Sequence, residues 1–203
     1  MGSYRAEIER CIGEVVRSCA HSPQADNLML RVTTFDSTVH ELHGFRPLAA
    51  CDPLSYSNAL TTGGTTALHD ASVNLCGSLH SYGASLTASA FCCNAIVFVI
   101  TDGIDNASST SAKAVGEALR GLVTSESLDS VLSVLVGVDV SGDALSLYLN
   151  RLRKDAGFDR YLELGDASEA LLTRLASFVS NSIGGPLARP WYWASRHVAD
   201  VLT

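Results

Sequence analysis

The sequence is short of charge, especially of positive charge, and it has no long apolar run. Only 17% of its 203 residues are charged, and the net charge is −7. Nucleic acids and anionic membranes attract basic patches, so this balance predicts neither a nucleic-acid nor a membrane partner. No apolar run approaches the roughly 18 residues of a membrane span, and the first ten residues contain no signal-peptide core. We therefore expect a globular cytoplasmic protein.

Several motifs of enzymes and metal centres are also missing. The six cysteines form no CxxC pair, and the histidines do not have zinc-finger spacing. The phosphate-binding pattern GxxxxGK[ST], the dinucleotide pattern GxGxxG and the nucleophile pattern GxSxG are absent. Most of the cysteines lie in apolar surroundings, which is typical of reduced core thiols in a cytosolic protein.

Strands and helices are predicted to alternate along the chain. The central stretch is the continuous apolar run Ala95 to Thr101, which is typical of a strand buried on both faces of a parallel sheet. The other predicted strands are Asn27–Phe35, Thr38–Phe45, Leu128–Val138 and Asp159–Leu164, and the predicted helices are Tyr4–Ala20, Ala67–Tyr82, Ser108–Val123, Ser141–Asp155 and Ala167–Ile183. This alternation predicts an α/β fold: a doubly wound, mostly parallel sheet with helices on both faces, and an antiparallel edge strand at Thr38–Phe45.

The predicted domain ends before a glycine-proline break. We expect one domain over residues 1–183 and a C-terminal tail over residues 184–203, because Gly184, Gly185 and Pro186 interrupt the pattern. The tail contains both tryptophans. It is interpreted either as a flexible tail or small docking helix, or as an aromatic segment that binds a partner.

Two loops carry the candidate site. Asp102 and Gly103 directly follow the central apolar strand, and open α/β folds place their ligand sites at the carboxyl ends of such strands. Thr65 and Thr66 follow two glycines and lead into a helix, whose first N–H groups need partners. The alternatives are an ordinary strand-ending turn and an ordinary threonine N-cap.

Together these loops resemble a von Willebrand factor A (VWA) domain. The similarity extends from about Tyr4 to Ile183 and includes the strand pair NLMLRVTTFDSTVHELHGF, the helix entry GGTTALHDA, the strand end VITDGIDN and the later strand VLVGVD. The resemblance implies a Rossmann-like fold with a metal-ion-dependent adhesion site (MIDAS) at the carboxyl ends of the strands. In that family the ion is usually Mg²⁺ or Mn²⁺, and a partner protein supplies an acidic ligand to it.

Carried onto this sequence, the resemblance implies a small set of site residues. Thr66 and Asp102 correspond to the metal ligands of the second and third loops. Thr65, Gly103, Asp105 and Asn106 would form the outer shell or the rim around the ion.

The first metal loop of the family has no counterpart before the first helix. The family carries DxSxS after its first strand, which is the central strand of the sheet, whereas this sequence begins Met1-Gly2-Ser3 and enters the helix at once. Met1 aligns with the methionine that often closes the family motif. We therefore expect the central strand to be missing, its neighbours to have unpaired edges, the fold to be less stable, and any metal binding to be weak.

The resulting functional hypothesis is a non-enzymatic protein-binding or scaffolding module of VWA type with an incomplete cation site. One alternative is a magnesium-dependent hydrolase or nucleotide-binding protein that uses Asp102 and Asp105 near His69 or Asp70. Another is a fragment that folds only when a partner donates the missing strand.

Overall fold

The fold is mixed α/β, as the sequence predicts. The computed structural model describes residues 5–22, 24–60, 64–138, 140, 143–164 and 195–202. In chain order the helices and strands are α1 (Arg5–Ala20), β1 (Leu28–Phe35), β2 (Val39–Pro47), α2 (Leu68–Ala88), β3 (Cys92–Thr101), α3 (Ala112–Thr124), β4 (Ser130–Val138), α4 (Asp143–Ala156), β5 (Arg160–Leu164) and β6 (Ser195–Leu202), with short 3-10 turns at Ala25–Asn27, Leu48–Ala50 and Pro53–Tyr56.

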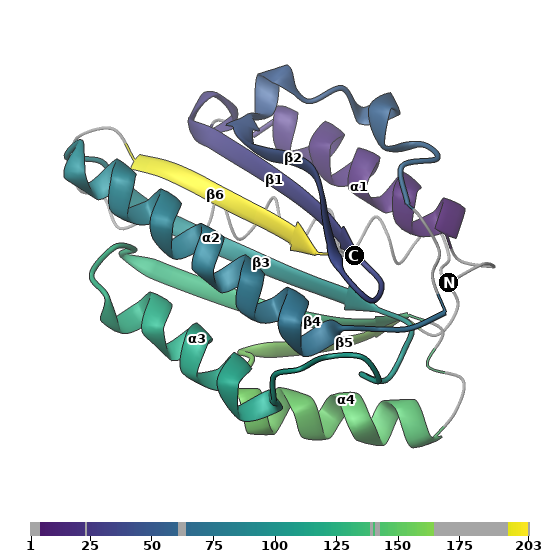
Figure 1. Cartoon of the computed structure of the whole chain (residues 1–203). Helices are drawn as coiled ribbons and strands as arrows, with labels where there is room; N and C mark the ends of the chain where they lie inside the picture. Colours follow the sequence, from purple (N-terminus) through teal and green to yellow (C-terminus); the bar gives the residue numbers. More distant parts are fainter. Residues whose placement is uncertain are drawn as a thin grey trace.

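The strands form one six-stranded sheet in the order β2-β1-β6-β3-β4-β5. Every neighbouring pair is parallel except β1 and β2, so the predicted antiparallel edge strand is confirmed. Figure 1 shows the arrangement, with β6 in yellow between β1 and β3. The parallel strands all end at the same edge of the sheet, where the loop after β3 also begins.

The central position of the sheet is filled, which corrects the sequence-based expectation. We expected β1 and β3 to face a gap, but residues 195–202 pair with both strands. A strand inserted there gives the inner backbone edges hydrogen-bond partners, so the expected source of instability is removed. The same residues were expected to belong to a tail. The expected boundary at residue 184, the predicted helix over residues 167–183 and the tryptophans lie outside the described residues.

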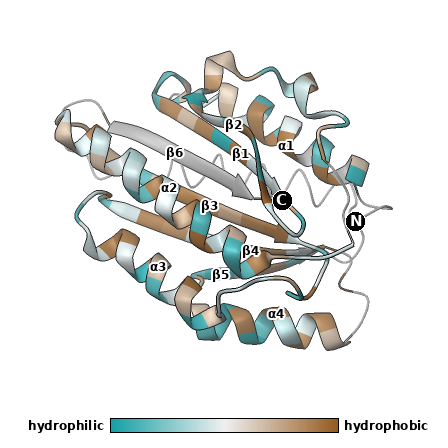
Figure 2. Cartoon of the chain, in the orientation of Figure 1, coloured by the Kyte–Doolittle hydropathy of each residue, from teal (hydrophilic) through white to brown (hydrophobic). Residues whose placement is uncertain are grey.

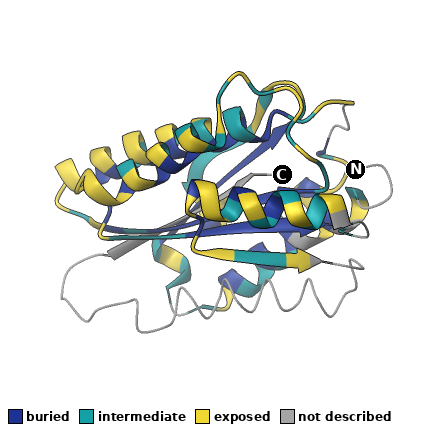
Figure 3. Cartoon of the chain, turned by 90° about the horizontal axis from the view of Figure 1, so that it is seen from below, coloured by how far each residue is buried: buried dark blue, intermediate teal, exposed yellow. Residues whose placement is uncertain are grey.

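Helices cover both faces of the sheet through two apolar cores. On one face, α1 buries the apolar stripe predicted from the sequence, which consists of Ile8, Ile12, Val15, Val16 and Cys19. On the other face, α2, α3 and α4 pack together. The side chains of β3 alternate between the cores, with Phe98 on the α1 side and Val97 on the α2 side. Figure 2 shows the resulting apolar run along β3, and Figure 3 shows buried strands between more exposed helices.

Candidate functional site

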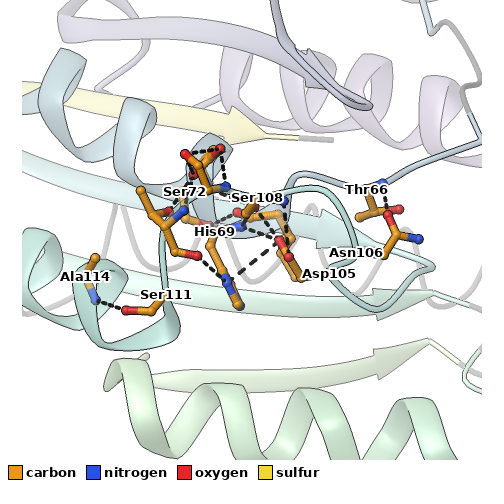
Figure 4. A network of polar contacts seen from close by, with 12 residues as sticks. Thr66, His69, Ser72, Asp105, Asn106, Ser108, Ser111 and Ala114 are labelled. Atoms are coloured by element: carbon orange, nitrogen blue, oxygen red, sulfur yellow. Dashed lines mark hydrogen bonds and ion pairs between the residues drawn. The ribbon is translucent and has the colours of Figure 1, made fainter.

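The two predicted loops meet at the carboxyl edge of the sheet. Residues 64–67 lead into α2, and residues 102–111 connect β3 to α3. The N–H of Thr66 donates to Oδ1 of Asn106 at 2.7 Å, and the N–H of Asn106 donates back to the carbonyl oxygen of Thr66 at 3.0 Å. The structure therefore brings Thr66 and Asn106 together through reciprocal hydrogen bonds (Figure 4).

The hydroxyl of Thr66 also lies close to the end of β3. A Cβ atom placed on Gly103 would lie 3.0 Å from Oγ1 of Thr66, so the glycine permits a tight approach between the loops. Asp102, the residue before this glycine, is half-buried, as is Thr66, whereas Thr65 is exposed. The two predicted metal ligands therefore belong to segments that touch at Gly103.

Asp105, which lies in the loop after β3, caps the N-terminus of α2. The first residues of a helix have N–H groups without partners inside the helix, and the residue before α2 is Ala67, which has no capping side chain. Oδ2 of Asp105 accepts from the N–H of His69 at 3.0 Å and from the hydroxyl of Ser108. The Ser108 hydroxyl oxygen in turn accepts from the N–H of Asp70 at 3.1 Å. The Asp105 carboxylate, predicted as an outer-shell residue, is thus engaged at a helix terminus.

His69 links these loops to α4. Its Nδ1 lies 3.2 Å from the carbonyl oxygen of Thr110, and its Nε2 lies 3.1 Å from the hydroxyl of Tyr148. A carbonyl oxygen can only accept, so Nδ1 donates to Thr110, and the Tyr148 hydroxyl is the hydrogen-bond partner of Nε2. Burial raises the pKa of Tyr148, which keeps its hydroxyl protonated and able to donate. These hydrogen bonds hold the loop before α3 against α2 and connect α2 to α4.

This network does not have the arrangement of a hydrolytic triad. The Ser108 hydroxyl donates to Asp105 rather than to the His69 ring, and Nδ1 of His69 lies 3.8 Å from Oδ2 of Asp105. A nucleophile needs a hydrogen bond to its general base. In the structure these side chains orient the loop and cap the first turn of α2.

Asp70, in the first turn of α2, accepts hydrogen bonds from the loop before α3. Its carboxylate accepts from the N–H groups of Ser109 and Thr110, both at 2.9 Å, and from the Thr110 hydroxyl at 2.6 Å. The hydroxyl and N–H donors of Thr110 and Ser109 lower the pKa of Asp70 to about 2, and partial burial opposes them. Asp70 and Asp105 therefore hold the two loops together from opposite sides.

The side chains at this edge fit a divalent cation poorly. Thr66 and Asp102 would supply one neutral and one charged oxygen, whereas Mg²⁺ prefers near-octahedral oxygen coordination. The carboxylates of Asp70 and Asp105 already accept backbone hydrogen bonds. Among the residues that the structure describes, no group of three or more His, Cys, Asp or Glu side chains has a metal-binding arrangement. Any ion held here would retain several waters.

The sequence did not identify every residue of the network. Asp70 was considered only for an enzymatic role, His69 and Ser108 only for that role or as part of the loop rim around the ion, and Tyr148 was not singled out. The serine-rich run at residues 108–111 did carry a signal, because serine and threonine are common capping residues. Tyr148, within a helix and far along the chain, carried none.

Comparisons of this chain with protein-family models, with curated proteins and with solved structures found no match. The resemblance to a VWA domain therefore rests on the sequence motifs alone. Within the described part of the chain, no helix is both long enough and apolar enough to cross a membrane.

Proposed function

We propose that this chain is a non-enzymatic protein-binding or scaffolding module of VWA type, with an incomplete MIDAS-like cation site. The observation that carries the proposal is the joining of the loop at Thr66 to the loop at residues 102–106, at the carboxyl edge of a parallel sheet. That edge is where open α/β folds bind ligands. The hydrogen bonds of Asp70 and Asp105 hold the loops together, so the loops present a preformed rim.

The strand order supports a Rossmann-like, doubly wound architecture. The usual order in such sheets is 3-2-1-4-5-6. The observed order β2-β1-β6-β3-β4-β5 is the same pattern if β6 takes the position of the first strand. The reversal in strand order then falls between β6 and β3. Ligand crevices form at such a switch point, and here it adjoins the loop that begins at Asp102.

In this proposal the cation would contribute little to the affinity for the partner protein. Thr66 and Asp102 would hold Mg²⁺ or Mn²⁺, and a carboxylate from the partner protein would fill an open coordination position. The rim around it would consist of Thr65, Gly103, Asp105 and Asn106. With so few ligands from the chain, direct contacts between the rim and the partner must supply most of the affinity.

The alternative of a fragment that needs a partner strand is less well supported. Residues 195–202 of the chain itself provide the strand between β1 and β3.

The proposal also places the module in the cytoplasm. Five cysteines of the described part of the chain, Cys19, Cys51, Cys76, Cys92 and Cys93, are free thiols, which is the usual state in a reducing compartment.

Peptide selection on the immobilised chain tests this function. Ile104 lies in the rim loop and is 41% exposed, so Ile104→Ser should remove an apolar contact without unfolding the protein. Leu54, 72% exposed and part of the 3-10 turn at residues 53–56, provides the matched control Leu54→Ser. We expect a random-sequence library to yield acidic peptides that bind the wild type and Leu54→Ser at least tenfold more tightly than Ile104→Ser. Peptides that bind all three proteins equally would contradict a binding role for the rim.

A further inference from the structure

β6 lies between the hydrogen-bonding edges of β1 and β3, and we call the space between these two edges the slot. β1 and β3 face each other across it, and β6 pairs in parallel with both. Its register with β3 extends from Ser195 beside Cys92 to Leu202 beside Val99. The slot therefore offers a complete set of backbone partners to one extended segment, which is the chemistry of strand addition.

The segment that fills this slot is unusually polar for a central strand. Strands buried in the middle of parallel sheets are commonly continuous apolar runs, as in β3. The segment SRHVADVL instead includes Arg196, His197 and Asp200. Backbone pairing places Asp200 between Arg31 of β1 and Val97 of β3. An acidic residue thus occupies the register position beside a basic one.

Arg31, the β1 residue beside Asp200 in the strand register, is a buried cation. Only 4% of the residue is exposed, and its guanidinium lies 2.9 Å from Oε2 of Glu41 and 3.5 Å from Oδ1 of Asn74. The ring of Phe45 lies 5.9 Å away. A buried guanidinium is costly unless negative charge surrounds it, and Glu41 is half exposed on β2. A strand that brings a carboxylate to the neighbouring position is therefore favoured in this register.

We propose that the slot between β1 and β3 is a strand-binding site, that the opposite charges at positions 31 and 200 set its register, and that it also takes residues 195–202 from a second copy of this chain. A one-residue slip would move Asp200 away from Arg31 and would exchange the two faces of the strand. In coiled coils a single polar residue at a core position is known to specify register.

The connection to β6 allows the same strand to reach a second copy. Residues 165–194 link the carboxyl end of β5, at the sheet edge, to the amino end of β6, with β3 and β4 between them in the strand order. The tether must span about 14 Å across the sheet and about 26 Å along it. A segment of this length reaches at most roughly 100 Å when fully extended, and roughly 70 Å if residues 167–183 are helical as predicted. In an exchanged pair every strand contact is reproduced, so chain concentration decides between the closed and exchanged forms.

Complementary charge variants separate exchange from pairing within one chain. Arg31→Asp and Asp200→Arg each place like charges side by side in their own slot. We expect each variant alone to lose its cooperative unfolding transition. Refolded together in equal amounts, the two variants should form a dimer with a cooperative unfolding transition, because each slot then receives a strand of opposite charge; its Tm should stay below that of the wild type, since Arg31→Asp also removes the ion pair with Glu41. The double variant in one chain should also fold.

A matched exposed pair provides the control. Arg151→Asp and Asp155→Arg reverse charges of an ion pair on the surface of α4, and neither variant alone nor their mixture should change the oligomeric state. Light scattering after size-exclusion chromatography measures that state. If the double variant folds but the mixture of single variants does not, the slot takes the strand only from its own chain, and exchange is refuted. If the double variant also fails, or the single variants behave like wild type, charge does not set the register.

Discussion

Neutralising Asp70 should weaken the fold in a way that depends on pH. The carboxylate joins α2 to the loop before α3 by accepting from two N–H groups and two hydroxyls of Ser109 and Thr110. These donors lower its pKa from 3.8 to about 2. If the unfolded chain has the ordinary pKa, the ionised carboxylate stabilises the fold by at most about 2.4 kcal/mol.

Solvent screening reduces that figure. Asp70 is only half-buried, so we expect Asp70→Asn to lower the free energy of unfolding by about 1–2 kcal/mol at pH 7. For a chain of this length that corresponds to a decrease in Tm of about 3–6 °C. Asp155→Asn, at an exposed position of α4 with a surface ion-pair partner, should cost less than about 0.5 kcal/mol and provides the control.

The pH dependence gives the decisive test. A carboxyl group whose pKa is lowered by folding stabilises the protein above its unfolded pKa, and this stabilisation is lost as pH falls through the folded pKa. The difference between wild type and Asp70→Asn should therefore be constant from pH 7 to pH 5, shrink below about pH 4, and vanish near pH 2. Urea unfolding followed by circular dichroism at each pH measures it. A difference that is absent at pH 7, or unchanged at pH 2.5, would refute the assignment.

Two further predictions concern the packing on either face of the sheet. Glu9 is 7% exposed, and its carboxylate accepts from the N–H groups of Asn58 and Leu60; burial alone would raise its pKa, but these bonds and Arg5 lower it. Glu9→Gln should thus cost about 1–3 kcal/mol by urea unfolding at pH 7, less at lower pH, and an unchanged midpoint would contradict this. A Cβ on Gly83 would lie 2.8 Å from a backbone oxygen, whereas one on Gly77 in the same helix meets nothing within 4 Å. Thermal unfolding should show Gly83→Ala destabilised by about 1–3 kcal/mol and Gly77→Ala neutral or stabilised by up to about 1 kcal/mol, and equal shifts would contradict the packing.

Local patterns were sufficient to predict most of the architecture. The apolar run Ala95–Thr101 became β3, and the stripe on the first helix became one of the two cores. These features depend on hydrophobic periodicity, which a sequence displays directly. The meeting of the Thr66 loop with the loop after β3 also followed, because both were expected at the carboxyl edge of one sheet.

Features that depend on distant pairing were not accessible in the same way. Arg196, His197 and Asp200 interrupt the apolar pattern of β6, so nothing local marked it as a central strand. Its position depends on pairing with β1 and β3, which lie far away in the sequence. Asp105 was similarly interpreted as a site residue, because its role as a cap for α2 depends on a helix that begins far away in the sequence.

Paramagnetic broadening by Mn²⁺ tests the proposed cation site most directly. In amide NMR spectra of the labelled protein, millimolar Mn²⁺ should broaden the signals of Thr66, Ala67 and Gly103 first, with half-saturation in the millimolar range because the chain supplies few ligands. Asp102→Asn should abolish that selectivity, while Asp155→Asn should not alter it. Broadening concentrated elsewhere, or unchanged in Asp102→Asn, would contradict the proposed site at the carboxyl edge of the sheet.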